Sequence, residues 1–278
     1  MTATTDPRLA PSPGATPSSP LKRVTAIALA EVKLLLRNRV VLATAVLLGP
    51  AMAGFFVFLN REFAESAIFM TYVVNLVFVF GALLALFYNL TTIFVTRREE
   101  RVFKRLATGE ATYGEALAAT SAPSVVIFVG QVVLAGVAAA FFAPMPSWDN
   151  PLLVVLAMVL VIVCFVSLAA WHTSFTSTSE GAQYTTLPAF IGFMLFSGIG
   201  FPTSMMPDVM GRIAEFTPLH AASELILLGM SGENQMAEVH SGFADSMAAG
   251  LFPLAVLAGW TVAGVVLARM FMRFEPRR

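Results

Sequence analysis

The chain has 278 residues, of which 57% are hydrophobic and 12% are charged, and its formal net charge at pH 7 is zero. Charged residues make up about a quarter of an ordinary soluble domain, so this composition excludes that class and favours a protein embedded in a membrane. The single cysteine, Cys164, lies inside a hydrophobic run, where we expect a small apolar core residue. A lone cysteine also excludes an internal disulfide.

The first twenty residues are rich in proline, serine and threonine and offer little apolar surface to bury. We therefore expect a disordered tail over residues 1–20. This tail does not read as a secretory signal, because the first hydrophobic run begins only near Val40 and no small-residue cleavage site follows it closely. We assign residues 21–278 to a single membrane domain.

The segment Leu21–Leu36 precedes the first hydrophobic run and mixes apolar with basic side chains. Ser19 and Pro20 are suitable residues for starting a helix, and the mixed pattern predicts an amphipathic helix that lies in the membrane interface. A simple basic flank that orients the first span explains the same residues equally well.

Six hydrophobic stretches follow, each suited to a membrane-spanning helix, because about 20 apolar residues cross a bilayer core of roughly 30 Å. The predicted spans are Val40–Leu59, Ile68–Val95, Pro123–Phe142, Pro151–Trp171, Tyr184–Phe201 and Ala248–Met270. Asp149 and Asn150 are candidate caps for the fourth span. The predicted fold class is all-α, an integral membrane protein with six transmembrane helices.

Lysine and arginine are distributed unevenly between the two sides of the membrane that these spans define. Only Arg61 and Arg212 fall on one side, and the other fifteen of the seventeen basic residues fall on the opposite side. Basic residues are retained on the cytoplasmic side during insertion. We therefore predict that both termini are cytoplasmic and that the loop between the second and third spans is a cytoplasmic, strongly basic one.

That basic loop predicts a short amphipathic helix at the cytoplasmic face. Its residues are Arg97, Arg98, Glu99, Glu100, Arg101, Val102, Phe103, Lys104, Arg105 and Leu106. Val102, Phe103 and Leu106 share one face at helical spacing, and the next helix is predicted to begin at the capping box Thr112-x-x-Glu115. A positive-inside anchor would account for the basic residues alone. The two acidic residues and the phenylalanine favour a surface that docks a partner.

The connection between the fifth and sixth spans, Pro202–Met247, is the longest and is punctuated by prolines. It contains a helix of about a dozen residues, from Thr217 to Gly229, that is too short to span a bilayer. We expect an extracellular re-entrant hairpin that dips back into the membrane and is covered by protein or lines a water-filled cavity. His220 and Glu224 lie four residues apart, either as a metal or catalytic pair or, as we favour, as an outward polar face.

Motifs for catalysis and for cofactor binding are missing from the sequence. It contains no phosphate-binding loop of the Gly-x-x-x-x-Gly-Lys-[Ser/Thr] type and no cysteine–histidine cluster with metal-ligand spacing. We therefore expect no enzyme activity, cofactor or metal in this chain. The spans also lack the ionisable residues of ion-coupled transporters, which favours a separate motor subunit. Their polar residues Asn75, Asn89 and Gln131 either satisfy a neighbouring helix or line a pathway.

In this order of elements the chain resembles the permease subunit of type-2 ABC exporters, a group that includes bacterial drug, antibiotic and polysaccharide export permeases. The resemblance covers nearly everything after the tail. One motif runs from Arg98-Glu99-Glu100 to Lys104-Arg105-Leu106, and another runs from Gly200-Phe201-Pro202 through Met206-Pro207 to Thr217-Pro218. The chain departs from the family pattern at Arg101, where glycine is frequent, and at Glu110, where proline is common.

The resemblance implies that the work is divided between subunits. Arg97–Leu106 would be the coupling helix that docks into a groove on a separate ATPase subunit, and that subunit would hold ATP and magnesium. A second permease chain, most simply an identical one in a homodimer, would complete the pathway in a bacterial inner membrane, in contact with lipid and without nucleic acid. The outer gate is expected at Pro202, Met206, Pro207, Thr217, Pro218 and Glu224.

The expected function is ATP-driven export of a hydrophobic small molecule such as a drug, an antibiotic or a natural product. Twenty-four phenylalanines and fourteen methionines suit an apolar, adaptable pathway, and lipid-facing packing explains most of them equally well. Export of a polysaccharide or a lipid-linked glycan is the alternative within the family. An accessory membrane protein that binds a partner without transporting anything is the alternative outside it.

Overall fold

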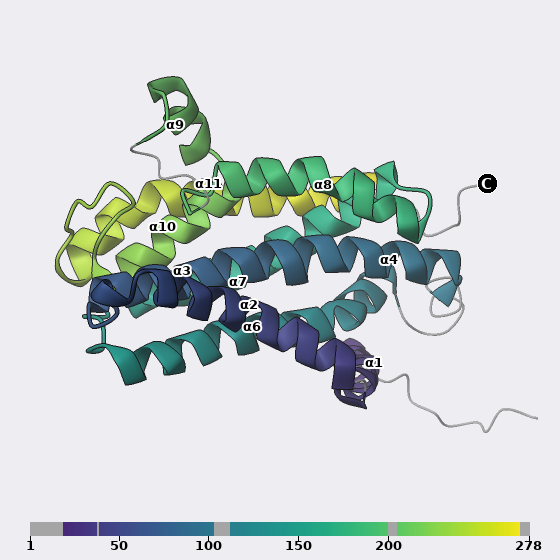
Figure 1. Cartoon of the computed structure of the whole chain (residues 1–278). Coiled ribbons are helices and arrows are strands. Elements are labelled where there is room, and N and C mark those ends of the chain that lie inside the picture. Colours follow the sequence, from purple (N-terminus) through teal and green to yellow (C-terminus); the bar gives the residue numbers. More distant parts are fainter. Residues whose placement is uncertain (1–18, 38, 103–111, 200–204, 273–278) are drawn as a thin grey trace, which may run out of the picture.

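The computed structural model describes residues 19–37, 39–102, 112–199 and 205–272, and the helices among them lie side by side in an elongated bundle (Figure 1). The helices are α1 Pro20–Arg37, α2 Arg39–Leu59, α3 Ala67–Gly81, α4 Asn89–Glu99, α6 Tyr113–Phe142, α7 Pro151–His172, α8 Ser179–Leu195, α9 Asp208–Glu215, α10 Pro218–Ser231 and α11 Gly242–Phe271. We call the end of the bundle that holds α1 and the last turn of α11 the termini end. The opposite end, where α10 connects to α11, is the loop end.

Within the described part of the chain, four helices are long and apolar enough to cross a membrane. They are Ala67–Glu99, Gly114–Phe142, Pro151–Phe175 and Gly242–Phe271, and they correspond to predicted spans two, three, four and six. The first predicted span coincides with α2, whose described apolar part is Gly49–Leu59. The fifth coincides with α8, which at 17 residues is short for a crossing. That the chain crosses the membrane six times therefore stays a prediction.

The start of α6 is set by its cap and not by the hydrophobic run. The predicted span began at Pro123, whereas the helix begins at Tyr113, directly after the predicted cap residue Thr112. The Thr112 hydroxyl accepts a hydrogen bond from the Glu115 N–H (3.3 Å), and the Glu115 carboxylate accepts one from the Thr112 N–H (2.7 Å). The predicted capping box is thus confirmed, and it satisfies two N–H groups that the helix cannot satisfy itself.

Capping residues also set the ends of α7 and α10. The Asn150 side chain accepts a hydrogen bond from the Leu153 N–H (3.3 Å), which confirms Asn150 as a cap of α7. α10 ends at Ser231, two residues beyond the predicted Gly229, because the left-handed residue that stops it is Gly232, with φ 66°.

The continuous helix Ala67–Glu99 is the centre of the bundle. In its most hydrophobic stretch 67% of the residues are buried, against 22% for α6 and for α11, so the other helices surround it. It consists of α3, a π-helical segment over Ala82–Tyr88, and α4. At the end of the π segment the Asn89 N–H bonds to the Leu84 carbonyl, a pairing that widens the helix and is frequent at functional sites.

The predicted N-terminal helix is confirmed as α1, which packs against α6 at the termini end. Its leucines Leu21, Leu29 and Leu36 are exposed on the outside of the bundle. Such an uncovered apolar stripe is expected of a helix that lies in the membrane interface. Its placement in that interface stays a prediction.

α10 enters the bundle from the loop end and is buried along almost its whole length. At its C-terminal end the carbonyl of Gly229 accepts a hydrogen bond from the Asn150 N–H (3.1 Å), and the carbonyl of Met230 accepts one from the Trp148 N–H (2.9 Å). The end of α10 is thereby level with the start of α7. With 14 residues the helix is about 21 Å long, and it lies within the bundle between α3, α7 and α11.

The N-terminal end of α10 lies near the middle of the bundle. The Phe216 carbonyl, just before α10, accepts a hydrogen bond from the Trp260 indole N–H of α11 (2.7 Å). The next residue of α11, Thr261, donates to the Leu160 carbonyl of α7 (3.3 Å). Because α7 runs from Pro151 to His172, Leu160 is close to its midpoint, and so is Phe216.

The predicted re-entrant hairpin has a different form from the one expected. α10 is a helix of the predicted kind that reaches only the middle of the bundle. α9, which precedes it, does not lie along α10 as a second limb but stands out from the side of the bundle (Figure 1). Residues 200–204, which connect α8 toward α9, lie outside the described residues.

Candidate functional site

The predicted coupling segment starts as the last turn of α4 and not as a separate helix. α4 continues through Arg97 to Glu99, and Arg101 then takes the left-handed conformation with φ 56°. The predicted single helix from Arg97 to Leu106 is therefore wrong at its start, because the chain breaks direction at Arg101. The later part of the segment, Phe103, Lys104, Arg105 and Leu106, lies outside the described residues, and docking by this segment stays a prediction.

Arg98 points into the protein. Its side chain is 1% exposed, Nη1 donates to the Thr173 carbonyl (2.9 Å), and Nη2 donates to the carbonyls of Thr176 and Ser177. These carbonyls belong to the turn that follows α7, where the helix dipole places partial negative charge. Arg98 therefore fastens the α7–α8 connection to the end of α4. The sequence analysis had assigned it to a docking surface.

Two neighbours of Arg98 also make contacts within the chain. Arg97 Nη2 lies 2.9 and 2.8 Å from the two carboxylate oxygens of Glu31 on α1. The Glu99 carboxylate accepts a hydrogen bond from the Ser179 N–H at the start of α8 (3.3 Å), where an acidic group is favoured by the helix dipole. Glu99 and Glu100 are both exposed, so both acidic residues of this segment face outward, and Glu100 lies 3.9 Å from Arg97.

α1 is tied to both sides of the connection between α4 and α6. On one side Arg97 pairs with Glu31, and on the other the Arg23 guanidinium lies 2.9 Å from the Glu115 carboxylate at the start of α6. All four side chains are at least partly buried, so solvent screens these pairs less than fully exposed ones. A displacement of residues 100–112 would therefore pull on α1 as well as on α4 and α6.

The three polar residues predicted inside the spans have separate surroundings. Asn75 is buried and donates to the Ser223 hydroxyl of α10 (2.8 Å). Asn89 donates to the Ser124 hydroxyl of α6 (3.4 Å). The buried side chain of Gln131 packs against glycines of α2 and α3. The three residues join different sets of helices, and a single polar pathway through all three stays a prediction.

A polar cluster near the loop end was not recognised in the sequence. The Gln235 side-chain amide donates to the Ser223 hydroxyl (3.0 Å) and to the Ser197 carbonyl at the end of α8 (3.2 Å). The Gln235 N–H donates to the Glu224 carboxylate (3.0 Å). Gly198, with φ 79°, lies directly against this amide, and a Cβ there would come within 1.6 Å of Gln235 Oε1. Gln235 thus connects α8, α10 and the loop that follows α10.

His220 and Glu224 do not form the outward polar face that the sequence analysis favoured. His220 is buried, and the Glu224 carboxylate is held by the Gln235 N–H. Burial raises the pKa of the Glu224 carboxyl to about 7, with the Gln235 hydrogen bond opposing that change. Among the described residues no group of three histidine, cysteine, aspartate or glutamate side chains could hold a metal ion.

Of the predicted gate residues, Thr217 makes side-chain hydrogen bonds to two neighbouring elements. Its hydroxyl donates to the Phe196 carbonyl at the end of α8 (3.3 Å) and to the Ala214 carbonyl of α9 (2.8 Å), so the corner between α9 and α10 is tied to α8. Pro218 is buried in the first turn of α10, and Pro207 is the N-cap residue of α9. Met206 precedes α9 and is partly exposed, and Pro202 lies outside the described residues.

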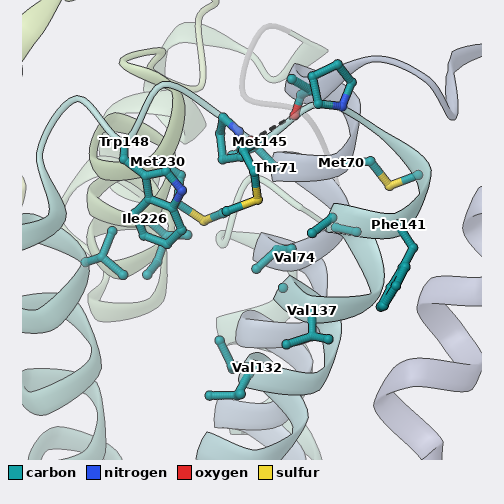
Figure 2. Close-up of a pocket in the computed structure, with 18 of the residues that line it drawn as sticks. Met70, Thr71, Val74, Val132, Val137, Phe141, Met145, Trp148, Ile226 and Met230 are labelled. Atoms are coloured by element: carbon teal, nitrogen blue, oxygen red, sulfur yellow. Dashed lines mark hydrogen bonds between the residues drawn. The ribbon is translucent and has the colours of Figure 1, made fainter.

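An apolar pocket of about 520 Å³ opens near the loop end. Figure 2 shows Met70 and Val137 from α3 and α6 on its walls, with Met145, Trp148 and Met230 toward its upper rim. Nearly all of its lining is apolar, so it suits a hydrocarbon-rich ligand and offers few partners to a polar one. The sequence analysis did not identify it, because its walls come from four helices and the α6–α7 connection.

A family model described as ABC-2 type transporter matches residues 22–230, which is most of the chain. The match includes α1, the buried central helix, the α4–α6 connection and α10. A comparison with curated proteins gave no match. The long apolar helices agree with the family, whose members are membrane components of transporters and not catalytic subunits. The chain therefore belongs to the ABC-2 type transporter family and is a multi-pass membrane permease subunit of an ABC transporter.

Proposed function

We propose that this permease works as half of an ATP-driven exporter that moves a hydrophobic small molecule out of the cell. A separate ATPase subunit would bind at the termini end and supply ATP and magnesium, and a second copy of this chain would complete the pathway. The observation that carries the proposal is the fastening of the α4–α6 connection to α1 and to the α7–α8 turn. This one connection reaches two other parts of the bundle, α1 and the α7–α8 turn.

The proposed coupling follows from those contacts. A push on residues 100–112 is passed to α1 through Arg97 and Glu115, and to the α7–α8 turn through Arg98. The exposed residues Glu100 and Arg101 are available for the ATPase surface. Because α4 continues into the π segment and α3, a displacement at the termini end is carried along the central helix toward the polar cluster at Gln235.

The termini end is assigned to the cytoplasm on the distribution of charge. The basic residues of α1 and of the last turn of α4 lie at this end, whereas Arg61 is at the loop end. Retention of basic residues on the cytoplasmic side then orients the bundle. In a bacterium this membrane would be the inner one, with both termini inside the cell.

The apolar pocket favours a hydrophobic substrate over a glycan. A sugar chain needs hydrogen-bond partners to replace the water that it loses on binding, and among the residues that line this pocket Thr71 is a rare polar one. The Thr71 hydroxyl is already bonded to the Ala67 carbonyl of its own helix (3.0 Å). A drug, an antibiotic or another apolar natural product fits these walls better.

The coupling proposal is tested by reversing charge at the exposed end of α4. In membranes that contain the permease with its co-purifying ATPase, Glu100→Lys should abolish permease-stimulated ATP hydrolysis while leaving membrane insertion unchanged. The matched control is Glu62→Lys, an exposed acid at the loop end, which should hydrolyse ATP like the unaltered protein. Equal hydrolysis in both variants would contradict docking at this segment and favour an accessory protein that transports nothing.

A further inference from the structure

α9 carries two adjoining stripes of opposite character. Asp208, Arg212 and Glu215 follow helical spacing along one side, and they hold all the charge of this eight-residue helix. The stripe beside them consists of the large apolar residues Val209 and Ile213, both exposed. Ala214, on the remaining side, is buried against the chain. In the described structure the charged stripe makes no ion pair or hydrogen bond through its side chains.

The charged stripe lies at the depth of the membrane. The base of α9 is fixed at the midpoint of α7, because the Phe216 carbonyl bonds to Trp260 and the neighbouring Thr261 bonds to Leu160. The Phe216 ring also packs on Phe252 of α11 at 5.5 Å between centroids. An eight-residue helix is about 12 Å long, which is less than half the thickness of a bilayer core of roughly 30 Å.

This depth excludes lipid as the neighbour of the charged stripe. α9 stands out sideways from the bundle (Figure 1), and the described part of the chain leaves Asp208 and Arg212 exposed. Charged side chains at membrane depth face protein or a water-filled cavity, because hydrocarbon offers them no hydrogen bonds. The side of the permease that bears α9 must therefore be covered by something polar.

The pattern of charge on α9 identifies what covers it. Arg212 stands between two acidic residues, so the stripe is complementary to a copy of itself. When two identical surfaces meet across a two-fold axis, each residue contacts the residue that contacts it. Two antiparallel α9 helices would then place each Arg212 beside Asp208 or Glu215 of the other copy.

We infer that the face bearing α9 is where two copies of this chain meet, with the charged stripes opposed across a two-fold axis at membrane depth. The inference rests on the proposed pairing of two identical permeases and adds to it the face, the helix and the residues. It also explains why α9 departs from the bundle instead of packing along α10: in the pair, α9 reaches across to the other copy.

The test uses a cysteine beside the charged stripe. A Cβ at Gly211 meets nothing within 4 Å, so Gly211→Cys places a thiol next to the stripe and keeps all three charges. With Cys164 replaced by alanine, this becomes the only thiol. The matched control is Val159→Cys, beside Leu160 on α7, at the same depth and 52% exposed. Oxidation in native membranes should join two differently tagged copies through position 211 and not through position 159.

Charge reversal tests the complementarity itself. Arg212→Glu leaves only acidic residues in both stripes and should reduce the cross-linking at least tenfold. Adding Asp208→Arg and Glu215→Arg to that variant restores complementary stripes and should restore the cross-link. Rescue by the triple variant also excludes misfolding as the cause of the loss.

Two results would overturn the inference. One is a cross-link at position 211 no stronger than at position 159, and the other is a cross-link to a different protein instead of a second tagged copy. The outcome is independent of the coupling experiment. If Glu100→Lys leaves ATP hydrolysis intact but the position 211 cross-link forms, the proposed function fails and the pairing face stands. If Glu100→Lys abolishes ATP hydrolysis but no cross-link forms at position 211, the proposed function stands and only the pairing face is wrong.

Discussion

Replacing Arg98 by alanine should destabilise the permease by about 3–5 kcal/mol, because several buried carbonyls lose a charged donor and each such loss costs roughly 1–3 kcal/mol. The guanidinium is 1% exposed and donates to three carbonyls of the turn after α7. A hydrogen bond to a charged group contributes roughly 1.5–3 kcal/mol, and three bonds made by one group are not additive. Without Arg98 the carbonyls lose a charged donor, and the α7–α8 turn loses its buried attachment to α4.

Arg98→Lys should lower the free energy of unfolding by less, about 1–3 kcal/mol. An ammonium keeps the charge but lacks the planar fork that reaches several carbonyls. Arg61→Ala is the control: this arginine is exposed at the loop end, and its loss should stay within about 0.5 kcal/mol. Both comparisons separate the geometry of the Arg98 site from the removal of a positive charge.

The protein contains its own reporter for this experiment. Cys164 is the only cysteine and is completely buried, so a thiol-reactive fluorophore labels it only as the helices separate. In mild detergent the melting temperature of Arg98→Ala should fall by on the order of 10 °C, with Arg98→Lys between it and the unaltered protein. A melting temperature for Arg98→Ala equal to that of Arg61→Ala would refute the structural role assigned to Arg98.

Three further predictions use the same melting assay. Arg101→Gly should be stabilising by about 1 kcal/mol, because Arg101 has φ 56° and glycine adopts that conformation without steric cost; a lower melting temperature would contradict this. Gly198→Ala should destabilise the protein by roughly 1–3 kcal/mol, because φ is 79° and the new Cβ would meet the Gln235 amide. Adding Gln235→Ala to this variant should recover part of the lost stability. A double variant that melts no higher than Gly198→Ala would contradict the contact. The folded pKa of Glu224 is raised to about 7, so ionisation opposes folding as pH rises from about 4.5. Glu224→Gln should therefore melt above the unaltered protein at pH 8, with the advantage lost at pH 4; a gain independent of pH would refute it.

Hydrophobic runs and caps allowed much of the fold to be predicted. Apolar stretches of spanning length correspond to the long helices, and the capping box at Thr112 and Glu115 is present as expected. Hydrophobic runs locate the centre of a helix better than its ends, because α6 and α11 both begin several residues before their hydrophobic stretch. The first turn of α6 is held by its capping box, and that of α11 by a hydrogen bond from the Gly242 N–H to the Asp149 carboxylate.

The direction of a charged side chain was the main error. Arg98 was assigned to a docking surface from its charge, yet it is buried and donates to the turn that follows α7. A signal was present for Arg98, which lies four residues after the buried Phe94 and so continues the buried face of α4. Charge was given more weight than helical position.

The sequence analysis placed no ionisable group in the interior of a span, whereas the structure brings Glu224 of α10 in among the long helices. Glu224 and the charges of α9 belong to elements too short to span, so a search of the spans alone passes over them. Their depth depends on tertiary hydrogen bonds such as that between Trp260 and the Phe216 carbonyl. No local pattern encodes a contact between residues 44 positions apart.

The account rests on the claim that an ATPase subunit binds at the end of α4. A photo-activatable cross-linking amino acid at Glu100, in the tagged chain in its native host, tests this most directly, with the same amino acid at Glu62 as the control. The account predicts one prominent adduct from position 100, with a protein that carries a phosphate-binding loop, and none of that kind from position 62. Adducts with no nucleotide-binding protein, or the same adducts from both positions, would contradict it.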